Sequence, residues 1–421
     1  MLKFELVQTD KHSIKILLRR KNLRFLRRTN HIQNRCATFE KKLMRLKKYI
    51  YLLISLLILQ SCATTKIENS KNNNYAGYQN IIDSIYQNNP KSIGIMVHIE
   101  SPKNGISWSG SVGYSDAENK IKLTPDQPAL IASSIKTYVS ATILRLQEQN
   151  KLSIEDAIKN HLTDKTIKLF ESDGYDLDRI RIKHLLSHTS GIEDYGTDEY
   201  LDWVDKNQKH RWTRDEQLEL TITAGKPLGK PADIFNYADA NYLLGTEIIE
   251  NVTKKPFYES IRELLKYEEL GFSNTWFPTL ETKNKQTKSL VHQYWGEKNW
   301  DSYNHDISWD LYGGGGIATT TKELAQFSYD LFNDKIIKDK NTLNLISTPI
   351  ETKDGKDNKY GLGLSIGNVK GYTSYGHGGF WGTVVLYFPE METSIAVFIL
   401  ERNERILRKN VLEALVLELS K

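Results

Sequence analysis

The sequence predicts an α+β protein, with an antiparallel sheet built from segments near both termini, flanking helices and a helix-rich lobe beside the sheet. Three observations support this prediction. Apolar residues alternate with the period of a strand near residue 95 and again after residue 360. The chain between about 152 and 310 is polar and carries helix-start patterns instead. Strands at both ends around a helical insert indicate one sheet that joins the two ends.

The first elements of this sheet are a hairpin and a helix. Apolar residues occupy every second position over 93–99, and a second strand is expected over 105–114, after a Pro-Lys-Asn turn. Apolar residues then recur at helical spacing from about Ser134 to Asn150. This helix begins at the residues that carry the strongest functional pattern in the chain.

The later elements follow from capping patterns and alternation. Thr213-x-x-Glu216 marks a helix start inside the lobe, and 242–252 is an apolar helix. Glycines 313–316 predict a flexible crossing back to the sheet. After it we expect a helix from Thr320, strands over 360–366, 383–388 and 393–400, and an amphipathic helix over 405–419.

The N-terminal segment has the pattern of a bacterial lipoprotein signal peptide. Met44 is followed by three basic residues, an apolar run over 49–59 and then Leu59-Gln60-Ser61-Cys62, which resembles a lipobox. The run is shorter than the roughly twenty residues that a membrane-spanning helix needs. We therefore expect a signal peptide over 44–61, a lipidated Cys62 that anchors the protein at the bacterial cell envelope, and a polar tether over 62–75. A plain signal peptide or a buried helix are the alternatives.

Residues 1–43 hold twelve Lys or Arg and three acidic residues. A nucleic-acid-binding arm is one interpretation, and the one we prefer is that translation starts at Met44. The whole chain has 57 basic and 52 acidic residues, which gives a net charge of +5. Residues 1–61 hold 15 of the basic and 3 of the acidic residues. The rest of the chain therefore has 42 basic and 49 acidic residues and a net charge of −7. The basic total is therefore no argument for a nucleic-acid partner.

The expected folded domain, residues 76–421, contains neither of the two cysteines, Cys36 and Cys62. Disulfides, thiolate catalysis and Cys-bound metals are thus excluded there. His184 and His188 could share a helix face, but neither a third ligand nor a neighbouring Glu accompanies them, so we expect a structural role. No metal or other cofactor is expected.

Ser133-Ser134-Ile135-Lys136 is a Ser-x-x-Lys pattern at the start of the expected helix. At this spacing the two side chains share one face, and the free N–H groups of the helix N-terminus point toward the serine oxygen. Lys136 accepts the proton of Ser133 only when it is neutral. That requires burial or like charge to lower its pKa by about three units, or roughly 4 kcal/mol. Ser133 as a helix cap with a solvated Lys136 is the structural alternative.

Two weaker patterns follow along the chain. Tyr237-Ala238-Asp239 precedes the apolar helix over 242–252. His377-Gly378-Gly379 lies before a C-terminal strand, where small residues let a substrate backbone approach closely. Each pattern alone is more often a turn than a site.

Together, in this order and spacing, the three patterns resemble the family of class C β-lactamases, serine D-alanyl-D-alanine carboxypeptidases and related esterases. The resemblance extends over about 81–417 and includes the connecting segments 150–156, 184–191, 237–242 and 313–320. It implies that Ser133 attacks a carbonyl carbon, that Lys136 accepts the serine proton, and that Tyr237 assists proton transfer to the leaving group and later from water.

The resemblance also implies a set of substrate-binding residues. The backbone N–H groups of Ser133 and Phe380 would form an oxyanion hole, with Asp239, His377 and Gly379 beside the substrate. His377 stands where most β-lactamases of this family have Lys, which favours the carboxypeptidase and esterase branches. Asp239 departs from the more common Asn, and an ionised Asp cannot donate a hydrogen bond to a substrate carbonyl.

Other candidate sites are weaker. Gly363-Leu364-Ser365-Ile366-Gly367 fits the nucleophile elbow of α/β-hydrolases, but a turn rather than a helix follows it. The aromatic residues Trp295, Trp300, Trp309 and Tyr312 either line the substrate site or pack in the core.

Two classes of function are compatible with these patterns. The first is a serine hydrolase that forms an acyl-Ser intermediate on D-amino-acid peptides, β-lactams or carboxylic esters, with a small molecule or a cell-wall peptide as substrate and no nucleic-acid partner. The second is a catalytically silent binding or scaffold lipoprotein with the same fold.

Overall fold

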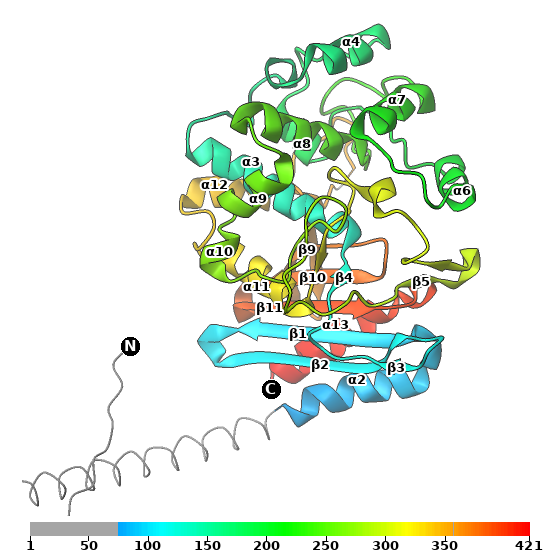
Figure 1. The fold of residues 1–421 in the computed structure, drawn as a ribbon. Helices are drawn as coiled ribbons and strands as arrows, with labels where there is room; N and C mark the ends of the chain where they lie inside the picture. Colours follow the sequence, from blue (N-terminus) through cyan, green and yellow to red (C-terminus); the bar gives the residue numbers. More distant parts are fainter. Residues whose placement is uncertain (1–74, 357) are drawn as a thin grey trace, which may run out of the picture. The chain divides into compact units, whose positions relative to one another are not determined.

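A computed structural model describes residues 75–421 with the exception of Asp357 (Figure 1). The expected signal peptide, the lipidated Cys62 and the basic segment over 1–43 lie outside these residues, as does the tether up to residue 74. Within the described part of the chain, no helix combines the length and hydropathy needed to cross a membrane.

A seven-stranded antiparallel sheet joins the two ends of the described chain. Strand β1 (Gly94–Ser101) pairs with β2 (Ile106–Asp116) on one side and with β11 (Thr393–Ile399) on the other. The sheet continues from β2 to β3 (Ile121–Lys122), and from β11 through β10 (Thr383–Phe388) and β9 (Tyr372–Gly378) to β8 (Ser365–Val369). The predicted hairpin and the antiparallel sheet are confirmed.

One predicted strand differs from the structure. We expected a strand over 360–366, but Tyr360 makes an isolated bridge with Ser365, and β8 begins only at Ser365. Gly363, between these two residues, has a positive φ of 81°, which favours glycine. The bend there lies close to the helix over 135–148, and a Cβ on Gly363 would lie 2.3 Å from Oγ of Ser140. After β8, Lys370 and Gly371 both have positive φ and form the turn expected after Gly367. The turn leads into β9, a strand that the sequence did not predict.

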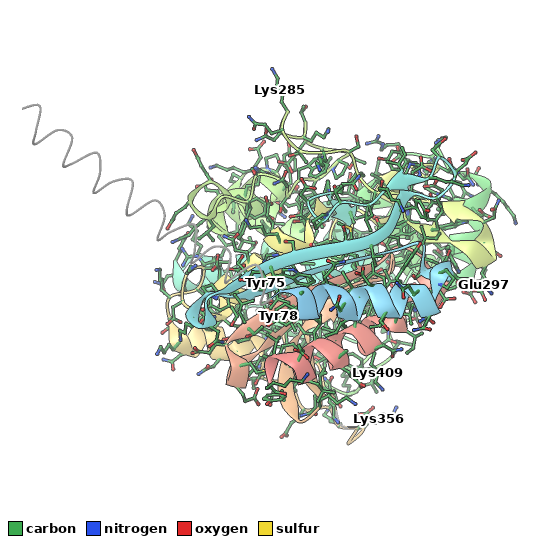
Figure 2. All side chains as sticks on the ribbon, turned by 90° about the horizontal axis from the view of Figure 1, so that it is seen from below. Tyr75, Tyr78, Lys285, Glu297, Lys356 and Lys409 are labelled. Atoms are coloured by element: carbon green, nitrogen blue, oxygen red, sulfur yellow. The ribbon has the colours of Figure 1, made fainter. Side chains whose placement is uncertain are left out.

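Helices cover both faces of the sheet. The outer face packs against α2 (Ala76–Asn88) and α13 (Leu407–Leu419), which lie side by side in Figure 2. There the ring of Tyr78 packs 5.4 Å from the ring of Trp108. The inner face packs against α11 (Thr321–Phe332), which begins after the predicted cap Thr320. Beyond it lie α3 (Ile135–Glu148) and α12 (Lys340–Ile346).

The segment over 152–310 is helix-rich, as predicted. Thr213 and Glu216 form the expected capping box. The lobe contains α4 (Asp164–Ser172), α5 (Ile182–Leu186), α6 (Asp198–Lys206), α7 (Arg214–Ala224), α8 (Ala240–Thr253), α9 (Phe257–Leu264) and α10 (Tyr267–Leu270). Short strand pairs connect this region to the sheet, namely β4 (Ala129–Leu130) with β7 (Ala318–Thr319) and β5 (Tyr294–Trp295) with β6 (Trp300–Asp301).

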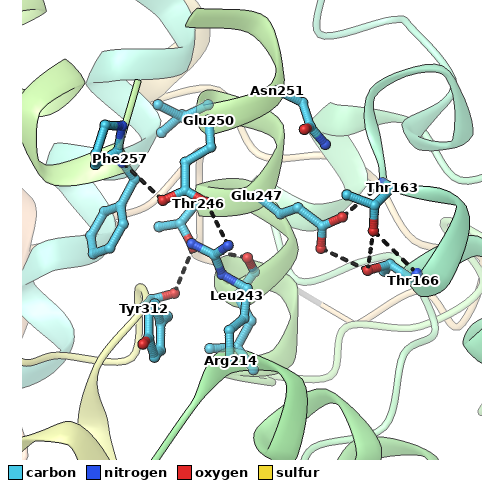
Figure 3. Close-up of polar contacts among 12 residues, drawn as sticks. Thr163, Thr166, Arg214, Leu243, Thr246, Glu247, Glu250, Asn251, Phe257 and Tyr312 are labelled. Carbon is cyan, nitrogen blue, oxygen red and sulfur yellow. Dashed lines mark hydrogen bonds and ion pairs between the residues drawn. The ribbon is translucent and has the colours of Figure 1, made fainter. Parts of the chain in front are cut away.

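Helix α8 is held in place by two carboxylates on its surface (Figure 3). Glu247 accepts a hydrogen bond of 2.8 Å from the N–H of Thr163, at the start of α4. Glu250 accepts one of 3.0 Å from the N–H of Phe257 on α9 and pairs with Arg214 on α7 at 2.6 Å. Three neighbouring helices are thus tied to α8, which also packs directly against α3. These contacts fix the residues just before the N-terminus of α8 relative to α3.

Candidate active site

Ser133 lies in a 3-10 turn, Ala132–Ser134, that runs directly into α3. Ala132 has a φ of 44°, which a residue with a side chain rarely adopts and which is often found at functional sites. Ser133 is half-buried, and Lys136 is completely buried one turn further along. The Nζ of Lys136 lies 3.2 Å from the Oγ of Ser133, so the solvated lysine of the structural alternative is excluded.

Lys136 is surrounded by groups from the helical lobe. Its Nζ pairs with Oδ1 of Asp239 at 2.6 Å and donates a longer hydrogen bond of 3.5 Å to the carbonyl of Gly314. It also lies 5.0 Å from the ring centroid of Tyr237 and 5.4 Å from that of Tyr242. Ser133, Lys136, Tyr237 and Asp239 therefore meet at one point, as the sequence predicted.

The protonation state of Lys136 differs from the expectation. Burial does lower its pKa, but the charge of Asp239 and the oxygen of Tyr237 outweigh burial and raise the pKa above its ordinary value. The expected depression by about three units is therefore wrong for the resting site, because an ion pair replaces the lost hydration. Other titratable groups that interact electrostatically with Lys136 are Asp194, Asp310, Tyr242, His188 and His377.

Tyr237 is held as a neutral phenol beside Ser133. The residue is 36% exposed, but loss of hydration around its hydroxyl raises the pKa of Tyr237 to about 12. Asp239 adds to this, whereas the charge of Lys136 and hydrogen bonds with Lys136 and Ser133 oppose it. His188 packs against the ring of Tyr237, with 4.2 Å between the two ring centroids. The Nδ1 of His188 accepts a hydrogen bond of 3.1 Å from the N–H of Ala238. Burial lowers the pKa of His188, so it is neutral. The histidine is thus structural, as expected.

Two carboxyl groups that the sequence did not indicate, those of the half-buried Asp194 and the buried Asp310, lie close to Asp239. Oδ1 of Asp194 accepts a hydrogen bond of 2.8 Å from the N–H of Asp239. Burial and the charge of Asp239 raise the pKa of Asp194 to about 7 and raise the pKa of Asp310 well above its ordinary range. Three carboxyl groups and one lysine therefore share a small volume.

The glycine run over 313–316 packs directly against these carboxyl groups. A Cβ on Gly315 would lie 1.9 Å from Oδ2 of Asp310, and one on Gly314 would lie 2.9 Å from Oδ1 of Asp310 and 3.5 Å from Oδ2 of Asp239. The run is thus more than a flexible crossing, because side chains there would collide with the acidic residues. The structure alone shows this close approach to Asp310.

The turn between β9 and β10 brings the third pattern to Ser133. The N–H of Gly379 donates to the carbonyl of Thr383 at 2.7 Å, and Oγ1 of Thr383 donates to the carbonyl of Ile131 at 3.1 Å. A Cβ on Gly379 would lie 2.2 Å from that same carbonyl oxygen. The backbone of Gly379 and Phe380 therefore lies beside the segment that leads into Ser133.

The side chain of His377 is engaged within the protein. Its Nδ1 lies 2.7 Å from the carbonyl of Gly378, its Nε2 lies 2.9 Å from the hydroxyl of Tyr360, and only 5% of the residue is exposed. Burial and the charge of Lys136 lower the pKa of His377 to about 3, so it is neutral. Nδ1 then donates to Gly378 and Nε2 accepts from Tyr360. Direct substrate contact by this side chain stays a prediction.

The tryptophans pack behind the site. Trp295, Trp300 and Trp309 are buried, and the rings of Trp295 and Trp309 lie 5.4 and 5.2 Å from the ring of Phe380. Tyr312 packs elsewhere, against Arg214. Of the two interpretations of these aromatic residues, core packing therefore holds.

Two other candidates also find structural roles. Ser365 is exposed at the start of β8 and is followed by a strand, so it is not a nucleophile elbow. His184 accepts a hydrogen bond of 3.0 Å from the N–H of Arg181 and caps α5.

Comparisons with known proteins agree with this geometry. Residues 94–416 match the family described as Beta-lactamase. The chain is 27% identical over 218 residues to Protein flp of Staphylococcus aureus strain COL, and 25% identical over 278 residues to the putative penicillin-binding protein PbpX of Bacillus subtilis strain 168. These matches cover 52% and 66% of this chain but 38% and 63% of the relatives.

Solved structures share the fold. A D-stereospecific amidohydrolase from Streptomyces sp. matches with a TM-score of 0.65 and 20% identity, covering 80% of this chain and 98% of that one. D-amino acid amidase from Ochrobactrum anthropi SV3 matches with a TM-score of 0.64 and 20% identity, covering 82% and 99%. The family match covers most of the chain. The protein therefore belongs to the β-lactamase family.

Proposed function

We propose that the protein is a serine hydrolase that forms an acyl-Ser133 intermediate on D-amino-acid peptides, β-lactams or carboxylic esters. The observation that carries this proposal is the buried Nζ of Lys136, 3.2 Å from the Oγ of Ser133 at the start of α3. Burying a charged lysine costs free energy, and titratable groups in such environments are found most often at functional sites. The names of two structural neighbours, a D-amino acid amidase and a D-stereospecific amidohydrolase, support acyl transfer on D-amino-acid derivatives.

Acylation follows from the positions of three side chains. Oγ of Ser133 attacks the carbonyl carbon as its proton passes to Lys136 in the neutral form. The N–H groups of Ser133 and Phe380 stabilise the oxyanion. The bond to the leaving group then breaks while Tyr237 gives its proton to that group, and Tyr237 recovers a proton from Lys136. One proton has moved in total, from Ser133 to the leaving group.

Deacylation uses the same groups in reverse. Water attacks the acyl carbon and passes a proton to the Tyr237 and Lys136 pair, the ester bond to Ser133 breaks, and Ser133 regains the proton. His377 in place of the Lys of most β-lactamases favours a carboxypeptidase or esterase over a dedicated β-lactamase. A silent scaffold would need none of these contacts.

A panel of substrates tests this proposal. The protein is mixed with D-alanyl-D-alanine peptides, penicillin G and short-chain carboxylic esters. After rapid acid quenching, the intact mass and the masses of the proteolytic peptides are measured. We expect the mass of the acyl group on the peptide that contains Ser133 for at least one class. A panel without any acyl adduct, together with full resistance of Ser133 to a fluorophosphonate, would support the silent scaffold.

We also propose that the protein is a lipoprotein of the bacterial cell envelope, on the strength of the pattern that ends at Cys62. Expression of the full gene followed by membrane fractionation tests this. The wild type should sediment with membranes and Cys62→Ala should not be lipidated. Equal amounts of both proteins in the soluble fraction would contradict the proposal.

A further inference from the structure

Asp239 lies between Lys136 and solvent. The side chain of Lys136 is fully buried, whereas that of Asp239 is 21% exposed. The two groups pair at 2.6 Å, and Nζ of Lys136 also lies 3.2 Å from Oγ of Ser133. Oδ1 of Asp239 and Oγ of Ser133 are therefore no more than 5.8 Å apart, since both lie next to the same nitrogen. A group that binds Ser133 from solvent meets Asp239 before it meets Lys136.

The negative charge beside Lys136 is concentrated on Asp239. Lys136 also faces the carboxyl groups of Asp194 and Asp310, but burial, together with the charge of Asp239, raises the pKa of both and favours their neutral forms. His188 and His377 are neutral and add no positive charge. A second cation on the solvent side of Asp239 would be attracted, and an anion would be repelled.

We propose that Asp239 selects substrates that carry a free, cationic amine next to the scissile carbonyl, and that this amine replaces Lys136 as the ion-pair partner of Asp239. This inference rests on the proposed acyl-Ser133 chemistry and narrows its substrates to amides, esters and peptides of amino acids with an unblocked α-amine. The short separation of Asp239 and Ser133 suits an α-amine, which is two bonds from the carbonyl carbon. Penicillins and internal peptide segments have an acylated, neutral nitrogen at this position.

The exchange of partners also explains how a lysine held as an ammonium becomes a base. When the substrate amine forms the ion pair with Asp239, Lys136 stays buried and now has a second positive charge nearby. Both effects favour the neutral form of Lys136. Its proton is released to solvent. The neutral Lys136 then accepts the proton of Ser133 as the serine oxygen attacks the carbonyl carbon. Binding of an amine-bearing substrate thus produces the base that its own acylation needs.

The test compares two substrates that differ only at the amine, D-alanine p-nitroanilide and N-acetyl-D-alanine p-nitroanilide. We measure kcat and KM for the wild type, Asp239→Asn and the matched control Asp178→Asn, whose side chain is 69% exposed and pairs with Lys159. The wild type and the control should prefer the free amine by at least about tenfold in kcat/KM, as one ion pair in a partly buried site allows. Asp239→Asn should lose this preference, so that its kcat/KM values for the two substrates become similar whatever their absolute size.

A second measurement needs no variant. The preference of the wild type should fall above about pH 8, where the substrate amine loses its proton. An Asp239 with a merely structural role would, when replaced, slow both substrates by the same factor. Equal use of both substrates by the wild type, or a preference that Asp239→Asn retains, would overturn the inference. If a fluorophosphonate labels Ser133 and neither anilide acylates it, the amine proposal alone fails; if Ser133 resists every reagent, the proposed function fails as well.

Discussion

Lys136 and Asp239 form an ion pair of 2.6 Å directly beneath Ser133, and this pair sets the protonation state of the resting site. Burial alone would favour a neutral lysine, yet the carboxylate keeps the ammonium. An enzyme of this kind that had Asn in place of Asp239 would lack that charge. The pair therefore decides when Lys136 can act as a base.

Asp239→Asn should shift the pH dependence of Ser133 reactivity toward lower pH. The carboxylate raises the pKa of Lys136, so its removal lowers that pKa and more of the lysine is neutral at a given pH. We would measure the rate of fluorophosphonate labelling from pH 6 to pH 10 in the wild type, Asp239→Asn and Asp178→Asn. An unchanged profile in Asp239→Asn would show that Asp239 does not control the base.

Lys136→Ala should slow labelling of Ser133 at pH 7 by about 10²- to 10⁴-fold, the range typical for loss of a general base. Part of the rate should return at high pH, where hydroxide replaces the missing amine. Lys165→Ala, which removes a lysine that is 61% exposed, serves as the control and should label at the wild-type rate. Equal rates in all three proteins would leave Lys136 without a role in proton transfer.

Asp194→Asn should change how stability depends on pH. The folded-state pKa of Asp194 is raised to about 7, so this group favours folding below the pKa of the unfolded chain, and the benefit is lost as pH rises through about 4 to 7. In this window the wild type should lose stability by up to about 1.4 kcal/mol per pH unit from this group. Urea unfolding at pH 4.5, 5.5, 6.5 and 7.5 should show a flatter fall for Asp194→Asn. Identical slopes would mean that Asp194 titrates normally.

Gly315→Ala should destabilise the protein by about 1 to 3 kcal/mol, as overpacking typically does, because its Cβ would lie 1.9 Å from Oδ2 of Asp310. The variant should also label more slowly at Ser133, since the same segment carries the carbonyl of Gly314 that contacts Lys136. Gly77→Ala is the control, because its Cβ would meet only the flexible end of Glu418, at 3.3 Å. A Gly315→Ala protein with wild-type stability would rule out the close packing described here.

Much of the fold and part of the site could be predicted from local patterns. The Ser-x-x-Lys spacing places Ser133 and Lys136 on one helix face whatever surrounds them, and the capping box at Thr213 depends on four consecutive residues. Strand β9 has no comparable alternation, and it forms because the turn at Lys370 and Gly371 returns the chain beside β8.

The electrostatics of the site could not be predicted in this way. Asp194 lies in an irregular segment and Asp310 at the end of a short 3-10 helix (Ile307–Asp310), and only the tertiary fold brings them to Asp239. The pKa of Lys136 depends on burial and on a partner more than a hundred residues away along the chain. Sequence indicates the burial, but the distance between the two charges comes from the structure alone.

The most direct test of the account is the site of covalent modification by a fluorescent fluorophosphonate, mapped by peptide mass spectrometry. The label should lie on Ser133, disappear in Ser133→Ala and persist in Ser365→Ala, because Ser133 has Lys136 at 3.2 Å and a helix N-terminus behind it, whereas Ser365 is exposed on β8. Labelling that persists in Ser133→Ala and vanishes in Ser365→Ala would contradict the assignment of the nucleophile.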